Sequence, residues 1–324
     1  MSDRSIAHYN LLERIGESAL GEVYRARDTK FGRTVALKVV KADALEGAPR
    51  DAFLDDARTA ATLSHPNIAT LFDVGEYDGG CYLAYEFATG VTLRQEIAGH
   101  RVNPRRVVEL LVQIADGLAE AHAEGIIHTD IRPDTIFVTP KGNAKVIEFG
   151  MARWTRGGAV RRRAAVRPDS LGADAQGIVA YMSPEQALGG LVDARSDVFS
   201  LGVIAYEMLA GRNPFAGPRP ADTIVKIIAG QAAPASSVNP DVTPEFDALV
   251  SRALAKAIED RQQSAASFSA ELRSIGAMLD VRTGDSPAPG GFLPIDDDPG
   301  GGKWWVGIAG AIAVAAAAWW LYGR

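Results

Sequence analysis

The pattern of apolar residues changes at about Gly90, and this change limits the possible folds more than any other feature of the chain. Before Gly90, short apolar runs separated by turn residues predict β-strands, with one helix over about 50–64. The dipeptide Asp78-Gly79 between two such runs predicts a hairpin. After Gly90, apolar residues recur at helical spacing over Val107–Glu124, Ser196–Leu209, Ala221–Ile228 and Phe246–Ala255. A small strand-rich part followed by a larger helical part predicts an α+β fold with two lobes.

Composition and charge narrow the range of functions. The formal net charge of −6 argues against a general nucleic-acid-binding protein, which is normally basic. The single cysteine, Cys81, excludes an internal disulfide and fits a reducing compartment. The first six residues contain no apolar core, so no secretory signal is predicted and most of the chain is expected in the cytosol.

The segment 304–322 consists of nineteen residues without a charge. As a helix it would be about 28 Å long, close to the thickness of the hydrocarbon part of a bilayer. Tryptophan pairs stand near both ends, and Lys303 and Arg324 flank it, as is typical of membrane interfaces. We therefore expect a single transmembrane helix that holds the protein in the cytoplasmic membrane, with the C-terminus across it and no external sensor domain.

The remaining boundaries follow from composition. The segment 281–303 is rich in proline, glycine and aspartate and predicts a linker. The predicted organisation is a tail at 1–8, a folded domain at 9–280, the linker, the membrane helix and a tail at 323–324. One face of the membrane helix carries small residues that would permit a homodimer through close helix pairing. These residues are Gly307, Ala311, Ala315 and Ala318.

Several short motifs occur in a fixed order within about 9–275. A glycine-rich turn, Gly16 to Val23, stands between two predicted strands, and by itself it fits an ordinary hairpin equally well. The motifs that follow are Val35-Ala-Leu-Lys38, His128-Thr-Asp130-Ile-Arg-Pro-Asp-Thr135, Glu148-Phe-Gly150, Ser183-Pro-Glu185, Asp193-Ala-Arg-Ser-Asp197 and a late Arg261. In order and spacing, this set resembles the bacterial eukaryotic-like serine/threonine protein kinase family, with degenerate catalytic motifs.

The resemblance implies a bilobal protein-kinase fold and transfer of the ATP γ-phosphate to Ser or Thr of a cytosolic protein. A glycine-rich loop lets backbone N–H groups approach phosphates, and a lysine neutralises their charge. Asp56 would hold that lysine, and Tyr85 would stand at the back of the adenine site. The residues implied to bind ATP are Gly16, Ser18, Gly21, Val23, Ala36, Lys38, Asp56, Tyr85, Glu86, Ala88 and Phe137.

The resemblance also assigns catalytic, metal and structural roles. Asp130 would orient the attacking hydroxyl, with Arg132 beside it. Glu148 and Thr135 would bind Mg²⁺ (or Mn²⁺) through oxygen atoms, the ligands that this metal prefers. Among the structural residues, Asp197 would brace the backbone at His128. The implied structural ion pair joins Glu185 to Arg261.

Substitutions in these motifs bear on activity. Asp56 is one methylene shorter than the family's glutamate, and Glu148 is one methylene longer than its aspartate. Thr135 replaces an asparagine, Arg132 a lysine, and Ile178 a threonine of the activation segment. Because Mg²⁺ tolerates little geometric error, the substitutions predict a weak or impaired phosphotransferase. The alternative is a pseudokinase scaffold that binds nucleotide or partner proteins at the membrane. The presence of the Ser183-Pro-Glu185 and Asp197 motifs argues against a third class, the small-molecule kinases of related fold, which lack them.

The activation segment also departs from the family. Thr129 replaces the arginine that clamps a phosphorylated loop, so we predict that loop phosphorylation is not the switch. The segment between Met151 and Met182 contains few acceptors: Thr155, Ser170 and Tyr181. Its arginines fit a solvated loop or, alternatively, docking to anionic lipids or an acidic partner. They are Arg153, Arg156, Arg161, Arg162, Arg163 and Arg167.

Overall fold

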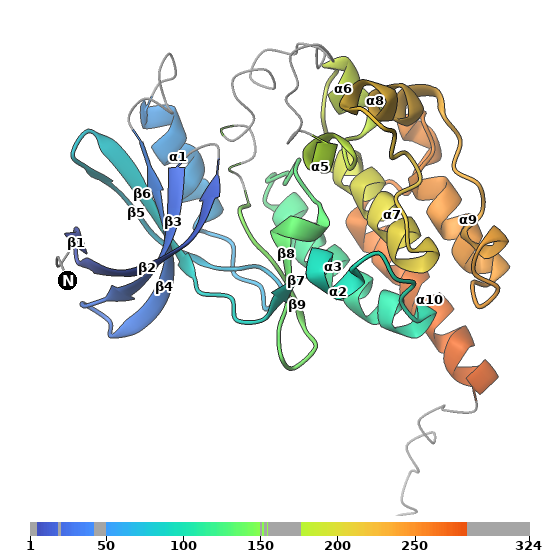
Figure 1. The fold of residues 1–324 in the computed structure, drawn as a ribbon, viewed down its shortest axis with the longest axis horizontal. Helices are drawn as coiled ribbons and strands as arrows, with labels where there is room; N and C mark the ends of the chain where they lie inside the picture. Colours follow the sequence, from blue (N-terminus) through green and yellow to red (C-terminus); the bar gives the residue numbers. More distant parts are fainter. Residues whose placement is uncertain are drawn as a thin grey trace, which may run out of the picture. The chain divides into compact units, whose positions relative to one another are not determined.

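The computed structural model describes residues 5–18, 21–41, 50–149, 151, 154 and 176–283 (Figure 1). Met1–Gly284 forms one compact unit, and the described residues all belong to it. Asp285–Arg324, with the predicted membrane helix, lies outside the described residues. Among the described ranges, none of the helices is long and apolar enough to cross a membrane.

The first lobe is built on a six-stranded antiparallel sheet with the order β1-β2-β3-β4-β6-β5. The Asp78-Gly79 hairpin predicted from the sequence is confirmed, since it joins β5 to β6. Its two residues have φ angles of 37° and 80°, the left-handed geometry that tight hairpin turns require. The strands are β1 (Ser5–Ile6), β2 (Tyr9–Ser18), β3 (Gly21–Asp28), β4 (Arg33–Val40), β5 (Leu71–Tyr77) and β6 (Gly80–Glu86).

Helix α1 (Arg50–Ala60) covers one face of this sheet (Figure 1). It buries Phe53, Leu54, Ala57 and Ala60, which recur at helical spacing and form a cluster with residues of β4 and β6. The predicted helix over 50–64 is thus confirmed, although it ends four residues earlier, at Ala60. The sheet and α1 together form the lobe that presents Lys38, on β4, toward the second lobe.

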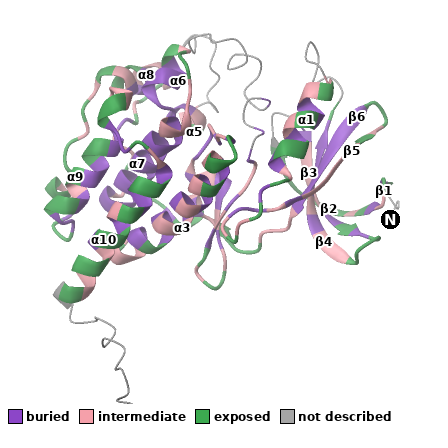
Figure 2. Ribbon diagram, turned by 180° about the vertical axis from the view of Figure 1, so that it is seen from behind, coloured by how far each residue is buried: buried purple, intermediate pink, exposed green. Residues whose placement is uncertain are grey.

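The second lobe is helical, and α7 lies at its centre. Fifteen of the seventeen residues of α7 are buried, so this helix is buried on all sides rather than on one face. Figure 2 shows buried positions on strand β6 and along the inner faces of the helices. The longer helices predicted from the sequence are confirmed. The helices are α2 (Leu93–Ile97), α3 (Pro104–Ala123), α5 (Gln176–Val179), α6 (Pro184–Leu188), α7 (Ala194–Ala210), α8 (Pro220–Ala229), α9 (Pro244–Ala253) and α10 (Ala265–Thr283), with short 3-10 turns η2 (Pro133–Thr135), η6 (Ala235–Ser237) and η7 (Ile258–Asp260).

Helix α10 was not predicted from the sequence; it runs into the segment interpreted as a linker and ends at Thr283. Its apolar residues Phe268, Leu272 and Ile275 recur at helical spacing, so the signal was present in the sequence. α10 packs along α3, where Ser269 donates a hydrogen bond of 2.7 Å to the Asp116 carboxylate.

A small sheet, β7-β8-β9, lies where the two lobes meet (Figure 1). Its strands are β7 (Val91–Thr92), β8 (Ile136–Val138) and β9 (Ala144–Val146). The side chain of Asn67 donates a hydrogen bond of 2.7 Å to the carbonyl of Ala144, which ties the connection after α1 to this sheet. β8 follows the segment that carries Asp130, and β9 leads into Glu148, so this sheet positions both residues.

A buried ion pair fixes the second lobe. The Arg261 guanidinium donates to both oxygens of the Glu185 carboxylate, at 2.8 and 2.9 Å, and Ser196 donates a third hydrogen bond at 2.5 Å. Burial alone would raise the pKa of Glu185, but the hydrogen bonds from Arg261 and Ser196 outweigh it and lower this pKa below its ordinary value. The pair joins α6 to the segment just before α10.

We predict that Arg261→Met lowers the free energy of unfolding at pH 7 by about 3–5 kcal/mol, because it leaves the Glu185 carboxylate buried without its partner. The lowered pKa of Glu185 contributes stability above its ordinary pKa, and this stability is lost as the pH falls. The difference between variant and wild type should therefore shrink on acidification. Urea unfolding at several pH values measures it. Arg219→Met, at an exposed pair with Asp222, is the matched control and should change little.

Candidate active site

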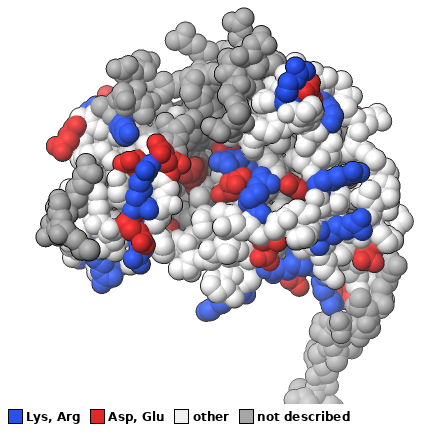
Figure 3. Space-filling view, in the orientation of Figure 1, with Lys and Arg blue, Asp and Glu red and all other residues white. Residues whose placement is uncertain are grey.

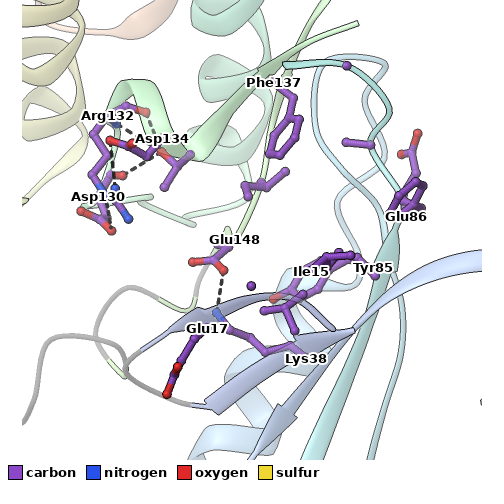
Figure 4. A pocket seen from close by; sticks show the side chains of 18 of the residues that line it. Ile15, Glu17, Lys38, Tyr85, Glu86, Asp130, Arg132, Asp134, Phe137 and Glu148 are labelled. Carbon is purple, nitrogen blue, oxygen red and sulfur yellow. Dashed lines mark hydrogen bonds and ion pairs between the residues drawn. The ribbon is translucent and has the colours of Figure 1, made fainter. Parts of the chain in front are cut away.

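A cavity of about 780 Å³ lies between the sheet of the first lobe and the loops of the second (Figure 4). Its size is typical of sites for small ligands. On the face shown in Figure 3, acidic and basic side chains gather at the centre, between the lobes. The residues that line the cavity are Ile15, Gly16, Glu17, Val23, Ala36, Lys38, Tyr85, Glu86, Phe87, Ala88, Thr89, Gly90, Asp130, Arg132, Asp134, Thr135, Phe137, Ile147, Glu148 and Ile178.

The glycine-rich turn forms one wall of the cavity. Gly16 lines it, and a Cβ atom there would meet no other atom within 4 Å, so the backbone is open to a ligand. Gly21 does not line the cavity. A Cβ atom on Gly21 would lie 1.9 Å from the Val39 carbonyl oxygen, so this glycine is required by the packing of β3 on β4. The backbone of Ser18 pairs with that of Gly21 at the ends of β2 and β3.

The segment that follows β6 forms the inner edge of the cavity. The carboxylate of Glu86 pairs with Lys145 of β9 at 2.8 Å, which fixes the end of the strand while Phe87 to Gly90 line the cavity. Phe137, on β8, lines another part of the wall (Figure 4). The sequence-predicted residues Val23, Ala36, Glu86, Ala88 and Phe137 therefore surround one cavity.

Tyr85 stands at the back of this cavity, and its hydroxyl group is buried without a hydrogen-bond partner among the described residues. The residue is 8% exposed. Burial, and then the negative charge of Glu148, raise the pKa of Tyr85 well above its ordinary value. The hydroxyl is therefore protonated, and none of the described residues accepts its hydrogen bond.

Lys38 and Glu148 form an ion pair across the cavity, with 2.6 Å between Lys38 Nζ and Glu148 Oε1 (Figure 4). Lys38 is 1% exposed and Glu148 is 23% exposed. The φ angle of Glu148 is 68°, in the left-handed region that non-glycine residues seldom adopt. The loop after β9 is thus shaped so that this carboxylate faces the lysine.

The carboxylate of Asp56 has a different partner from the one that the family pattern implies. It accepts a hydrogen bond of 2.6 Å from the indole Nε1 of Trp154. The ring of Trp154 also packs edge-on against Phe53, with 5.3 Å between the ring centres. In this structure Lys38 is therefore paired with Glu148, while Asp56 on α1 accepts a hydrogen bond from Trp154.

Asp130 and Arg132 lie together at the second-lobe side of the cavity. Arg132 contacts the Asp130 carboxylate at 3.3 Å and the Asp134 carboxylate at 3.1 Å. Thr135 is 2% exposed. Its hydroxyl lies 3.0 Å from the carbonyl oxygen of Asp130 and 3.0 Å from that of Arg132, and it accepts a hydrogen bond from the Arg132 amide. Thr135 therefore holds the backbone of this loop in shape.

Asp197 braces the loop that carries Asp130. Its carboxylate accepts hydrogen bonds from the backbone amides of His128 and Thr129, at 2.9 and 2.8 Å, and contacts His122 at 2.8 Å. Thr129 has a φ of 61°, a strained value that these contacts hold in place. The His128 ring accepts from the Asp130 amide and donates to the Ile147 carbonyl, so it links the loop to the approach to Glu148.

Several residues that line the cavity were not predicted from the sequence. Ile15 and Ile147 immediately precede the motif residues Gly16 and Glu148, so their place next to a motif was the available signal. Asp134 lies within the catalytic-loop motif, but its pairing with Arg94 at 3.2 Å depends on a residue far away in the sequence. Gly150 and the predicted basic loop, including Arg153 and Arg156 to Arg167, lie outside the described residues.

The residues of the cavity fit a nucleotide and a metal ion. The open backbone at Gly16 and the ammonium group of Lys38 suit phosphates, and the apolar wall suits a purine base. No group of three or more acidic, histidine or cysteine side chains that could hold a metal ion occurs among the described residues. Mg²⁺, however, is often bound by one or two carboxylates together with substrate phosphates, and Glu148 and Asp130 could supply these carboxylates.

Comparison with known proteins agrees with this geometry. Residues 9–271 match the protein kinase domain family. The chain is 39% identical over 280 residues to the serine/threonine-protein kinase PknB of Mycolicibacterium smegmatis, covering 84% of this chain and 43% of that protein. It is 32% identical over 273 residues to PrkC of Bacillus subtilis, covering 84% and 41%. The chain therefore belongs to the protein kinase family, and it spans less than half the length of these relatives.

A solved structure supports the same conclusion. The kinase domain of PknI from Mycobacterium tuberculosis superposes with a TM-score of 0.66 at 26% sequence identity. The match covers 85% of this chain and 98% of the PknI chain. The bilobal arrangement predicted from the sequence is therefore confirmed.

We predict that Tyr85→Phe leaves the free energy of unfolding unchanged or raises it by about 1 kcal/mol, because it removes a buried hydroxyl that has no partner in the described part of the chain. The matched control is Tyr82→Phe on the same strand, whose hydroxyl donates to Asp73 at 3.1 Å. That variant should lose stability. Denaturant unfolding of the nucleotide-free protein measures both, and an equal loss in the two variants would contradict the prediction.

Proposed function

We propose that this protein is an ATP-dependent protein serine/threonine kinase whose phosphotransfer is weak. The observation that carries the proposal is the convergence of Lys38, Asp130 and Glu148 on one cavity lined by a glycine-rich turn. These are the charged groups that phosphoryl transfer from a nucleotide requires, since the protein mainly positions the reactants and neutralises charge. Kinase activity in the named relatives adds support from the family.

Each residue has a role that its position allows. Lys38 binds phosphate oxygens, and the glycine-rich turn brings backbone N–H groups close to them. Asp130 accepts a hydrogen bond from the Ser or Thr hydroxyl of the substrate protein and orients it for attack. Arg132, held between Asp130 and Asp134, supplies positive charge beside the transferred group. Mg²⁺ or Mn²⁺, when bound through Glu148, would neutralise further phosphate charge.

The pairing inside the cavity is the reason for weak activity. Lys38 and Glu148 neutralise each other, so a nucleotide and its metal must separate them before either can act. Thr135 uses its hydroxyl to hold the backbone of its own loop, which reduces its value as a second metal ligand. Both features disfavour the arrangement in which Lys38 and a bound metal ion contact the phosphates. All the charged groups that this arrangement needs are nevertheless present in the site.

A nucleotide-binding pseudokinase scaffold is the second candidate function. The hydrogen bond between Trp154 and Asp56 favours it, because this contact keeps the α1 acid engaged while Lys38 stays paired with Glu148. In that case the folded domain would recruit protein partners, and its conformation would respond to nucleotide binding.

We further propose that residues 304–322 anchor the protein in the cytoplasmic membrane, with the kinase domain on the cytosolic side. The length of this apolar segment and its flanking tryptophan pairs support the proposal. Substrates or partners would then be cytosolic proteins near the membrane surface. The small residues along one face of the segment support a homodimer formed through it.

The test of catalysis follows phosphate transfer from radiolabelled ATP by the full chain in detergent, with Mg²⁺ and then Mn²⁺. We expect slow labelling of Ser or Thr that is lost in Asp130→Asn, because the substrate hydroxyl then lacks its carboxylate acceptor. Arg219→Met, at an exposed residue that does not line the cavity, should label as the wild type does.

No labelling above the Asp130→Asn level, in a protein that unfolds cooperatively and binds nucleotide, would contradict the kinase proposal. That result would favour the scaffold function. Labelling that persists equally in Asp130→Asn would contradict the assignment of Asp130.

A further inference from the structure

The start of helix α3 brings together distant segments of the second lobe. The Arg105 guanidinium donates a hydrogen bond of 2.8 Å to the carboxylate of Asp280, near the end of α10. The Arg106 guanidinium donates a hydrogen bond of 3.1 Å to the Gly142 carbonyl, in the turn between β8 and β9. The end of α10 and the β8–β9 turn therefore both border the first turn of α3.

Three basic side chains are exposed around this point. Arg101 precedes α3, Lys141 lies in the β8–β9 turn, and Arg212 follows the end of α7. The end of α7 is close by, because a Cβ atom on Gly211 would lie 3.4 Å from the Arg101 amide nitrogen. Within the described ranges, none of the three basic side chains has an acidic ion-pair partner. Their charges are therefore available to an anionic partner.

The acidic side chains at the start of α3 are already paired. Asp280 is bound to Arg105, and the Arg106 guanidinium contacts the carboxylates of Glu96, at 3.8 Å, and Glu109, at 3.3 Å. These acids are therefore engaged with arginines of α3 itself and do not neutralise the three exposed basic side chains.

The end of α10 adds exposed apolar side chains beside these charges. Val281 is 72% exposed and Met278 is 48% exposed. They are three residues apart, which places them on one side of the helix end. Figure 2 shows exposed positions along this end of α10. Apolar side chains next to basic ones suit the surface of an anionic bilayer, where the apolar groups enter the headgroup region and the cations contact the headgroups.

The position of this surface in the chain favours a bilayer over an acidic protein. Helix α10 ends at Thr283, and 20 residues separate it from the apolar segment 304–322. As a flexible chain, a linker of this length would span about 25 Å. If residues 304–322 are held in a membrane, the end of α10 is the part of the described fold that the chain itself keeps close to the lipid.

We propose that this surface docks on an anionic lipid bilayer. We call it the α3–α10 surface, and it consists of Arg101, Lys141, Arg212, Met278 and Val281. The inference rests on the proposed membrane anchoring by residues 304–322 and goes beyond it, because it assigns the side of the second lobe that faces the lipid. It also makes the approach of the folded domain to the membrane depend on the charge of the lipid.

The basic residues give the expected size of the effect. Each lysine or arginine near an anionic membrane surface changes binding by about fivefold, which corresponds to about 1 kcal/mol. Neutralising all three should therefore lower the ratio of docked to undocked protein by about a hundredfold.

The test measures energy transfer from a fluorophore on the full chain to acceptor-labelled lipids. Asn143→Cys places the fluorophore on the exposed β8–β9 turn, and Cys81 does not compete for it because it is fully buried. Vesicles of phosphatidylcholine are compared with vesicles that also contain about 30% phosphatidylserine. We expect stronger transfer on the anionic vesicles, and loss of this difference in about 1 M salt, because screening is then nearly complete beyond about 3 Å.

A charge-neutral variant and a matched control test the residues themselves. The variant combines Arg101→Gln, Lys141→Gln and Arg212→Gln, and its transfer on anionic vesicles should fall to the level on phosphatidylcholine. The control makes the same change of charge at exposed positions elsewhere and should behave as the wild type. Its substitutions are Lys30→Gln, Arg58→Gln and Arg219→Gln.

Two results would overturn the proposal. One is equal transfer on the two kinds of vesicle, which would leave the surface to an acidic protein partner instead. The other is an equal loss of transfer in the variant and the control, which would indicate an effect of net charge alone. Val281→Ser should lower the docked ratio by about tenfold, while Leu12→Ser, at a residue 54% exposed on β2, should not. Equal effects of these two substitutions would remove the apolar residues from the docking surface.

Flotation separates this proposal from the membrane anchor. A full chain that does not float with phosphatidylcholine vesicles would refute the anchor, whatever the docking surface does. The docking surface then still predicts flotation with the anionic vesicles, and the charge-neutral variant should lose it. Absence of that flotation would overturn the docking surface as well.

Discussion

The ion pair between Lys38 and Glu148 sets the state of the whole cavity. Lys38 is almost completely buried, and a buried ammonium group needs a partner of opposite charge. With Asp56 bound to Trp154, Glu148 supplies that charge from the loop after β9. The pair also spans the two lobes, so it couples the sheet that carries the lysine to the braced loop that carries Asp130. Under the proposed function, phosphates of a nucleotide reach Lys38 only when this pair opens.

Much of the scaffold around this pair could be predicted from the sequence. The two lobes follow from the change from strand-like to helical periodicity, and the structure and the comparisons confirm them. The contacts of Asp197 with the His128 backbone and of Glu185 with Arg261 are those that the motifs imply. Such contacts join groups whose positions the fold itself fixes, so motif order was sufficient to indicate them.

The choice of partner for Lys38 could not be predicted in the same way. The acid on α1, Asp56, accepts a hydrogen bond from Trp154, which is 98 positions away from it in the sequence and belongs to no motif. The left-handed backbone at Thr129 and Glu148 is likewise a result of tertiary contacts, because neither residue type favours it. Helix α10 is a different case, since its apolar residues recur at helical spacing in the sequence, but its last residues enter the segment whose composition predicts a linker.

The most direct measurement is the affinity for ATP without metal in Glu148→Gln, compared with the wild type. If Glu148 competes with the nucleotide phosphates for Lys38, its neutral substitute should bind metal-free ATP about tenfold more tightly or better, the effect expected from losing a hydrogen bond between charged groups. Asp134→Asn is the control, because it removes another acid of the cavity that does not contact Lys38 and should have a much smaller effect. Unchanged or weaker binding by Glu148→Gln would contradict the account, because the ion pair would then not limit access to the lysine.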